Sequence, residues 1–303
     1  MEQLTVSKIA TEALKPVSTI IDALLSAKLK RIRTWAEKKE LDSRLGSRVV
    51  DTLLDTYLKR LLRRISGITT IVFPQQVLPL TAIYEPLTLS EKFSDERQEP
   101  SRFSVAALDN GRSCVIVDSA GMGKSTFVKH LVLELLNSTT KIPMFLELRR
   151  ISDSETILGK LCSEIDETNT DVDERLLTKL FEDGNFVIIL DGYDELPENL
   201  RRRIGEEITR LAVVSNKNSI VLTARPEVSL PDISDSKVYR INPLNRYQAT
   251  SLLRRYDAIA SIDVGEKLIE QLDSVNEEFL QTPLLMVLLY RTYGFNQSIA
   301  TRI

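Results

Sequence analysis

The residues best suited to chemistry stand in DSAGMGKST, at positions 118–126. The apolar run CVIV precedes this stretch and a helical pattern follows it, so the stretch should connect a strand to a helix. Gly121 and Gly123 let the backbone close around a phosphate, and the N–H groups at the start of the helix attract its negative charge. The stretch therefore predicts a phosphate-binding loop.

The polar side chains of this loop each match one part of a nucleoside triphosphate. Lys124 is expected to reach the β and γ phosphates, Ser125 to hold Mg²⁺, and Thr126 to contact the α phosphate. The alternative is a glycine turn with a solvated lysine, but such a turn does not need the sequence Lys-Ser-Thr. The predicted nucleotide-binding residues of the loop are Ser119, Ala120, Gly121, Met122, Gly123, Lys124, Ser125 and Thr126.

A second candidate group follows FVIILD, residues 186–191, which is typical of a buried strand. Asp191 ends this strand, at the sheet edge where ligands bind in open α/β folds, and it fits the carboxylate that holds Mg²⁺. Asp194 and Glu195 follow at once and are expected to orient or deprotonate the attacking water. An acidic turn or helix cap would explain these residues if they stood alone. Their combination with GMGKST favours the catalytic interpretation.

Arg225 is the third candidate for catalysis. It follows the predicted strand SIVLTA, residues 219–224, and so should lie at the same sheet edge, where an arginine can sense or stabilise the γ phosphate. An exposed arginine before a turn proline is the alternative. The single histidine, His130, has no partner at a catalytic spacing and is expected to be structural.

Asp118 occupies the first position of the loop motif, where a glycine is expected. A carboxylate about 4 Å from a phosphate would cost on the order of 4 kcal/mol at an effective dielectric constant near 20. However, the amides that cradle phosphates come mainly from later positions, and aspartate tolerates unusual turn dihedrals. We therefore expect the carboxylate to point away from the phosphates and nucleotide binding to survive.

The elements that must position these residues fall into three parts. Helical spacing of apolar residues predicts a helical N-terminal domain and linker over residues 1–100, with helices near 19–41 and 47–65. Short apolar strands alternate with amphipathic helices over 101–243, which predicts an α/β fold with a parallel sheet covered on both faces. Residues 244–303 are helical again and suggest an incomplete subdomain of a truncated chain.

Two features of the N-terminal part leave alternatives open. Residues 71–104 hold four prolines and a charged patch, which predicts an ordered linker rather than a helix or a central strand. The two predicted helices also carry basic faces. A solvated surface explains them better than an anionic partner does. The basic residues are Lys28, Lys30, Arg31, Arg33, Lys59, Arg60, Arg63 and Arg64.

Composition excludes several classes of function. The 303 residues carry a net charge of -3, so nucleic-acid binding is not indicated. Two distant cysteines, Cys114 and Cys162, suggest neither a metal cluster nor a disulfide framework, and a reducing cytoplasm is the simplest location. No signal peptide and no apolar run of about 20 residues is present, so we expect no membrane span.

In order along residues 105–293, the motifs GMGKST, KIPMFLELR, DGNFVIILDGYDELP, IVLTARP, INPLNRYQATSLL and FLQTPLLMVLL are similar to those of a known family. The chain resembles the NACHT group of STAND nucleoside triphosphatases, which are signalling ATPases. Family members usually have a small residue at Asp118 and serine at Ala224. The resemblance implies an ASCE-type P-loop NTPase sheet with the Arg225 strand between the loop strand and the Asp191 strand. It also implies an adenine pocket contacted by Pro283.

The resemblance implies a switch that uses ATP, ADP and Mg²⁺. An ADP-bound monomer would exchange its nucleotide, form an ATP-bound self-oligomer and hydrolyse ATP slowly, in innate immunity or antiphage defence. The trigger would be recognised outside these residues, and the downstream effector is unknown. An assembly protein with little hydrolysis and a DNA-linked AAA-type ATPase are the alternatives. GTP is less favoured, because the one NK pair, in NKNS at 216–219, lacks the aspartate that reads guanine.

Overall fold

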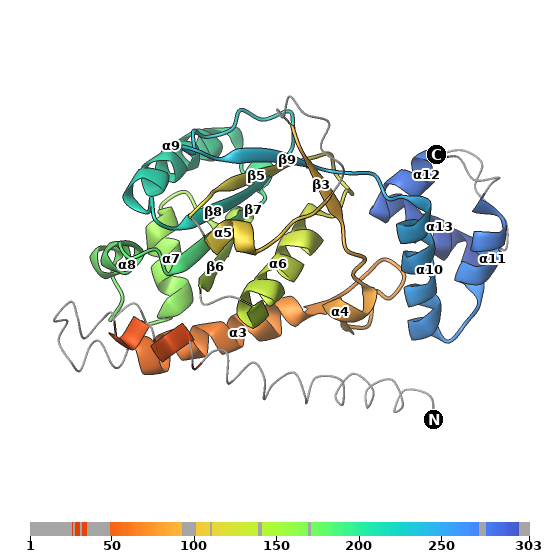
Figure 1. Cartoon of the computed structure of the whole chain (residues 1–303), viewed down its shortest axis with the longest axis horizontal. Coiled ribbons are helices and arrows are strands. Elements are labelled where there is room, and N and C mark those ends of the chain that lie inside the picture. The colour runs from red at the N-terminus through yellow and green to blue at the C-terminus, as the bar shows by residue number, and fades with distance from the viewer. Residues whose placement is uncertain are drawn as a thin grey trace.

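A computed structural model gives the fold of this chain (Figure 1). It describes residues 26, 28–30, 32–34, 49–92, 101–109, 111–138, 141–168, 171–272 and 277–296. Most of the helix predicted near 19–41 lies outside these residues, whereas the helix predicted over 47–65 is present. The described part of the chain is an α/β structure with a helical unit at one end, and this confirms the predicted fold class.

The central sheet has seven strands in the order β4-β3-β9-β5-β8-β7-β6. The five strands from β9 to β6 run parallel, while β3 pairs antiparallel with both β9 and β4. Because β8 lies between β5 and β7, the order predicted from the resemblance is confirmed. The strands are β3 (Thr88–Glu91), β4 (Ser101–Arg102), β5 (Cys114–Val117), β6 (Ile142–Glu147), β7 (Phe186–Asp191), β8 (Ser219–Ala224) and β9 (Lys237–Ile241).

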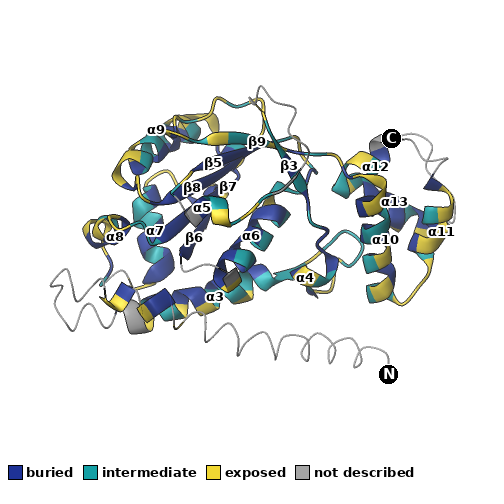
Figure 2. Ribbon diagram, viewed as in Figure 1, coloured by how far each residue is buried: buried dark blue, intermediate teal, exposed yellow. Residues whose placement is uncertain are grey.

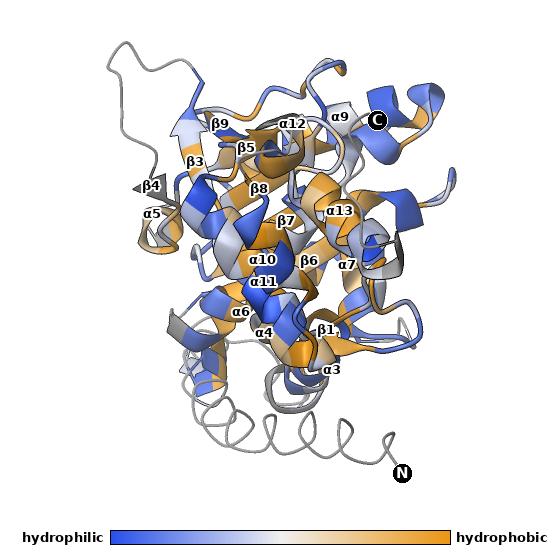
Figure 3. Ribbon diagram, turned by 90° about the vertical axis from the view of Figure 1, so that its right-hand side faces the viewer, coloured by the Kyte–Doolittle hydropathy of each residue, from blue (hydrophilic) through white to orange (hydrophobic). Residues whose placement is uncertain are grey.

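The buried strands explain why the sequence forms a parallel sheet. Every residue of β7 and of β8 is buried, as expected for strands that are covered on both faces. Figure 2 shows these strands in the buried interior, and the view in Figure 3 shows the same strands as largely hydrophobic. Glu147 is paired in register with Asp191, and Val117 with Ala224, so the carboxyl ends of four strands meet at one edge.

Helices cover both faces of the sheet. The chain crosses the sheet in one direction from β5 through α6 to β6, and in the opposite direction from β7 through α9 to β8. Because both connections are right-handed, α6 and α9 lie on opposite faces (Figure 1). Several helices begin at a residue whose side chain caps the first turn, such as Thr156, Asp173 and Asn245. The helices on the sheet are α5 (Ala106–Asp109), α6 (Lys124–Ser138), α7 (Ile157–Ile165), α8 (Glu174–Phe181) and α9 (Glu198–Val214), with the short turns η2 (Leu148–Arg150) and η3 (Tyr193–Glu195).

A separate group of helices forms the end of the molecule nearest the carboxyl terminus (blue in Figure 1). Its first helix starts with a capping box, in which Asn245 and Gln248 satisfy each other's backbone N–H groups. None of the helices in the described part of the chain is long and apolar enough to cross a membrane. The group consists of α10 (Arg246–Ala260), α11 (Val264–Glu270), α12 (Glu277–Gln281) and α13 (Pro283–Asn296).

The segment before the loop strand packs on the sheet and supplies two of its strands, β3 and β4. It contains η1 (Val49–Leu54), α3 (Asp55–Ser66), β1 (Gly67–Ile68), β2 (Leu78–Pro79), α4 (Leu80–Ile83) and then β3. The prediction that 71–104 is an ordered linker rather than a helix or a central strand is wrong, because α4 is a helix and β3 lies between β4 and β9 in the sheet. Pro79 ends β2 and directly precedes the first residue of α4, so it does not interrupt that helix. The sheet includes residues on both sides of position 100.

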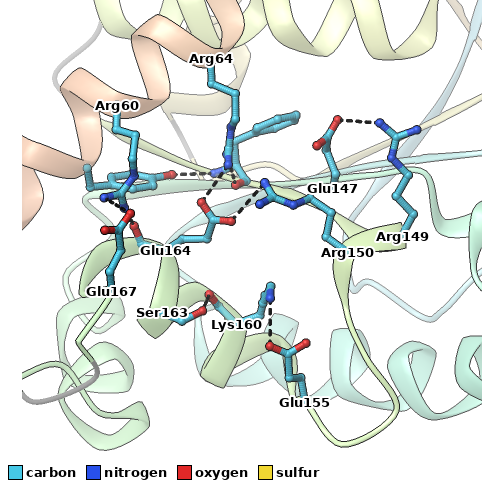
Figure 4. A network of polar contacts seen from close by, with 12 residues as sticks. Arg60, Arg64, Glu147, Arg149, Arg150, Glu155, Lys160, Ser163, Glu164 and Glu167 are labelled. Carbon is cyan, nitrogen blue, oxygen red and sulfur yellow. Dashed lines mark hydrogen bonds and ion pairs between the residues drawn. The ribbon is translucent and has the colours of Figure 1, made fainter.

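Basic residues of α3 contact carboxylates of the same chain. Arg64 pairs with Glu164 at 2.8 Å, and Arg60 pairs with Glu167 at 2.8 Å (Figure 4). These two arginines are therefore neither simply solvated nor available for an external anion, because they form ion pairs within the chain. The sequence pattern could not show this, because Glu164 and Glu167 lie about a hundred positions later in the chain.

Tyr57 caps the outer edge of the sheet. Its buried hydroxyl donates to the carbonyl oxygen of Pro143 at 3.2 Å and accepts from the N–H of Phe145 at 2.9 Å. Both groups belong to β6, the edge strand, so α3 supplies hydrogen bonds that a neighbouring strand would otherwise make. Burial raises the pKa of Tyr57, which keeps the hydroxyl protonated and able to donate.

We expect Tyr57→Phe to destabilise the fold, because it leaves a buried carbonyl and a buried N–H without partners. Each orphaned group costs about 1–3 kcal/mol. Urea unfolding followed by circular dichroism measures the loss. Tyr247→Phe, at a side chain that is 78% exposed, is the control and should change stability by less than about 0.5 kcal/mol. Equal stability of the two variants would contradict the edge-capping role.

Candidate functional site

The loop between β5 and α6 needs its two glycines for conformation and for space. Gly121 has φ +84° and Gly123 has φ +90°, in the left-handed region that favours glycine. A Cβ at Gly121 would also lie 3.0 Å from the Cβ of Leu284, at the start of α13. The Leu284 N–H donates to the Gly121 carbonyl oxygen at 3.3 Å. The helical group therefore contacts the loop directly.

Lys124 begins α6 and folds back over the loop. Its Nζ donates to the carbonyl oxygen of Asp118 at 2.5 Å and to that of Ser119 at 2.9 Å. Burial lowers the pKa of Lys124, and the carboxylates of Asp194 and Asp118 oppose this shift. The ammonium of Lys124 is thus held at the loop by hydrogen bonds to two backbone carbonyl oxygens.

The carboxylate of Asp118 is engaged with backbone N–H groups. Its Oδ1 accepts from Ser119 at 2.8 Å, and its Oδ2 accepts from Ile241, the last residue of β9, at 2.9 Å. Asp118 does not line the cavity described below. The carboxylate is thus paired with neighbouring N–H groups, and its charge favours the ammonium form of Lys124. That it points away from bound phosphates stays a prediction, as does the survival of nucleotide binding.

Asp118→Ala should therefore change stability more than affinity. The lost hydrogen bonds to an ionised acceptor are worth about 1–3 kcal/mol, and urea unfolding measures this loss. The dissociation constant for fluorescent ATP, measured by titration with Mg²⁺, should stay within about threefold of wild type. A large gain in affinity would instead mean that the carboxylate repels the phosphates.

Asp191 and Ser125, the two predicted Mg²⁺ ligands, lie together. Asp191 is buried at the end of β7, and its Oδ1 accepts from the hydroxyl of Thr223 at 2.6 Å. Burial raises the pKa of Asp191, whereas hydrogen bonds from Thr223 and Ser125 lower it. A carboxylate and a hydroxyl are hard oxygen donors of the kind Mg²⁺ takes, together with phosphate oxygens and water. The residues present fit this ion.

Thr223 holds the carboxyl edge of the sheet together. Besides its bond to Asp191, its Oγ1 accepts from the N–H of Gly192 at 2.8 Å. Gly192 has φ +81°, and this residue turns the chain from β7 into η3. Thr223 therefore fixes both the Asp191 carboxylate and the turn that carries the next two acids.

The two acids of this turn have different surroundings. Asp194 Oδ2 lies 2.9 Å from Nε of Arg225, and the Asp194 side chain is only 8% exposed. Glu195 is 40% exposed and lies 3.7 Å from Arg149, a looser contact. Burial raises the pKa of Glu195, while the Arg149 guanidinium lowers it. Asp194 is thus suited to orient Arg225, which leaves Glu195 as the candidate base.

These residues surround one cavity of about 400 Å³. Its polar end holds the loop, Asp191, Asp194, Glu195 and Arg225. Pro283 lies in the lining as well, whereas Ser119 and Met122 do not line it, and the Met122 side chain is buried. The rest of the lining is largely apolar and comes from both flanking segments: Ile68, Thr69, Thr70, Ile71, Ile83, Tyr84, Glu85, Leu87, Leu244, Leu252, Tyr256, Leu284 and Val287.

Sequence reasoning missed three parts of this site. Residues 68–71 line the cavity although they lie in the predicted N-terminal domain, and no motif marks them. Arg149 follows the strand MFLEL at the same edge, and that position was the available signal for it. Thr223 lies in β8, two residues before Arg225. Because β8 pairs with β7 up to Leu222 and Leu190, the next residue of each strand, Thr223 and Asp191, could have been expected to be neighbours.

Comparison with known proteins identifies one domain. Residues 112–258 match the family model of the NACHT domain, which is a P-loop NTPase domain and implies nucleotide binding. No curated protein matches the chain in sequence. A solved structure of PCH-2 from C. elegans is similar at 15% identity and a TM-score of 0.29 over 57% of this chain. The chain spans 44% of the length of that structure.

Proposed function

We propose that this chain binds ATP with Mg²⁺ and hydrolyses it slowly. One observation carries the proposal: the loop lysine, the acidic pair of η3 and Arg225 all line one cavity, whose other end is apolar. The polar end suits the phosphates and the apolar end suits a base. Residues 112–258 match a nucleotide-binding domain, which supports the same assignment.

Each residue has a role that follows from its contacts. The backbone N–H groups of the loop and Lys124 would bind the phosphates once Lys124 exchanges its two carbonyl partners for phosphate oxygens. Ser125 and Asp191 would hold Mg²⁺, which neutralises charge on the β and γ phosphates when bound. Pro283 and the other apolar lining residues would contact the base.

Hydrolysis requires a base and a cation at the γ phosphate. Glu195 accepts a proton from the attacking water, whose oxygen bonds to the γ phosphorus as the bond to the leaving oxygen of ADP breaks. Arg225 stabilises charge on the transferred group, and Asp194 orients it. The contact of Glu195 with Arg149 is longer than that of Asp194 with Arg225, so Glu195 is the less tightly held of the two carboxylates and the better placed to act as the base.

The nucleotide would control assembly. The start of α13 touches the loop and lines the cavity, so replacing ADP by ATP could change how the helical group sits on the sheet. We therefore propose an ADP-bound monomer and an ATP-bound oligomer, in a cytoplasmic defence or innate immune signal. The predicted units are 1–100, 101–243 and 244–303, but β3 belongs to the central sheet, so we propose that the nucleotide-binding unit begins before position 100. The trigger and the effector are left open.

Three measurements on the purified chain test this function. Fluorescent ATP and ADP with Mg²⁺ should bind, phosphate should be released over many turnovers, and light scattering should show a larger particle with ATP than with ADP. Binding without turnover would replace the enzyme by a nucleotide-dependent assembly protein. No binding of either nucleotide, with the fold confirmed by circular dichroism, would reject the proposal.

A further inference from the structure

A nearly buried carboxylate joins the three elements α3, α7 and η2 (Figure 4). Glu164, on α7, has a side chain only 10% exposed and lies between two guanidinium groups. Arg64 of α3 is 2.8 Å from its Oε2, and Arg150 of η2 is 3.4 Å from its Oε1. Arg64 also donates to the carbonyl oxygen of Phe145 in β6 at 3.3 Å. The cluster thus connects α3 to the end of the edge strand.

The neighbour of Arg150 in the same short turn faces the catalytic side. Arg149 lies 3.2 Å from Glu147 and 3.7 Å from Glu195. A 3₁₀ turn has three residues per turn, so consecutive side chains point in different directions from one rigid unit. The buried side chain of Leu148 fixes the third direction. The placement of Arg150 on one side therefore sets the placement of Arg149 on the other.

We propose that Glu164 is a positioning residue that holds Arg150, and with it η2, so that Arg149 contacts Glu195. Because Arg64 of α3 also pairs with Glu164, α3 would influence the position of Arg149 through the same contacts. This inference rests on the proposed hydrolysis of ATP, and it adds a link between that step and the segment that precedes the NACHT match.

The surroundings of Glu164 make its charge important. Without the carboxylate, two cations that are partly buried would face each other and repel, and η2 would shift away from α7. The pair of Arg60 with Glu167 joins the same region of α3 to the end of α7, but Glu167 is 71% exposed and does not contact η2. Exposed pairs of this kind contribute little, so this pair is a matched control.

Steady-state ATP hydrolysis by the full chain tests the positioning role. Glu164→Gln and Arg150→Gln should both raise kcat about two- to fivefold, because Arg149 no longer holds Glu195, and should leave KM within about twofold. Arg150→Gln keeps the pair of Arg64 with Glu164, so it separates this effect from loss of the fold. Arg150→Lys should restore the wild-type kcat, and Glu167→Gln should not change it. An unchanged kcat in Arg150→Gln, or a change of equal size in Glu167→Gln, would overturn the inference.

Hydrogen exchange decides the inference even if the wild type releases no phosphate. In the turn η3, the N–H of Glu195 donates to the carbonyl oxygen of Gly192 at 3.0 Å, so its exchange reports on the placement of this turn. Arg150→Gln should speed exchange over 148–150 and 192–196, whereas Glu167→Gln should not. Wild-type rates in Arg150→Gln would reject the positioning role. Absent turnover with faster exchange would reject only the proposed hydrolysis.

Discussion

Lys124→Ala is expected to weaken ATP binding by on the order of 30-fold to several thousand-fold, the loss that follows when one partner of a desolvated charge pair is removed. Lys124 lines the polar end of the cavity, and its ammonium already lies on the loop carbonyls of Asp118 and Ser119. Because this group is placed before the nucleotide arrives, little ordering cost offsets its attraction for the phosphates. Titration with fluorescent ATP and Mg²⁺ measures the loss.

A lysine elsewhere in the chain provides the control. Lys160, on α7, pairs with Glu155 at 2.9 Å and does not line the cavity. Lys160→Ala should therefore leave the affinity for ATP unchanged. Circular dichroism of both variants should match the wild type. If Lys124→Ala binds ATP as tightly as Lys160→Ala does, the loop does not hold the phosphates and the assignment of this cavity fails.

The parallel part of the sheet could be predicted because each strand is marked by its own residues. The strands β7 and β8 are continuous apolar runs, and helical patterns separate them from their neighbours in the chain. In contrast, β3 has four residues of which only Leu89 is buried, and it gains its place by antiparallel pairing with β9. Pairing with a strand so far along the chain leaves no local pattern, so this segment was predicted as a linker.

The site residues also fall into those that a local sequence pattern predicts and those that it does not. The loop and the acidic turn are short stretches in which neighbouring residues share one task, and such stretches were predicted from their spacing. The contact of Arg149 with Glu195 and the bond from Thr223 to Asp191 join different elements. Periodicity describes one element at a time and does not tell which side chain of another element faces it. The ion pairs of α3 were missed for the same reason.

We expect Glu195→Gln to lower kcat for ATP hydrolysis by about 10²- to 10⁴-fold, the usual contribution of a positioned general base. Glutamine keeps the shape of the side chain but cannot accept the proton of the attacking water. Glu195 lines the cavity, and among the described residues its carboxylate makes a loose ion pair with Arg149 at 3.7 Å. Affinity for ATP should hold within a few-fold, because the phosphates are bound by the loop. Multiple-turnover phosphate release measures kcat.

Two further variants separate the roles of the acidic residues. Glu198→Gln changes an exposed glutamate at the start of α9 and should leave kcat unchanged. Asp194→Asn should also lower kcat, but through Arg225, which loses its charged partner at 2.9 Å. Adding Arg225→Ala to Asp194→Asn should then cost little more, since the two residues act as one unit, whereas adding it to Glu195→Gln should cost more. If Asp194→Asn abolishes turnover and Glu195→Gln retains it, Asp194 is the base and the roles of the two acids are reversed.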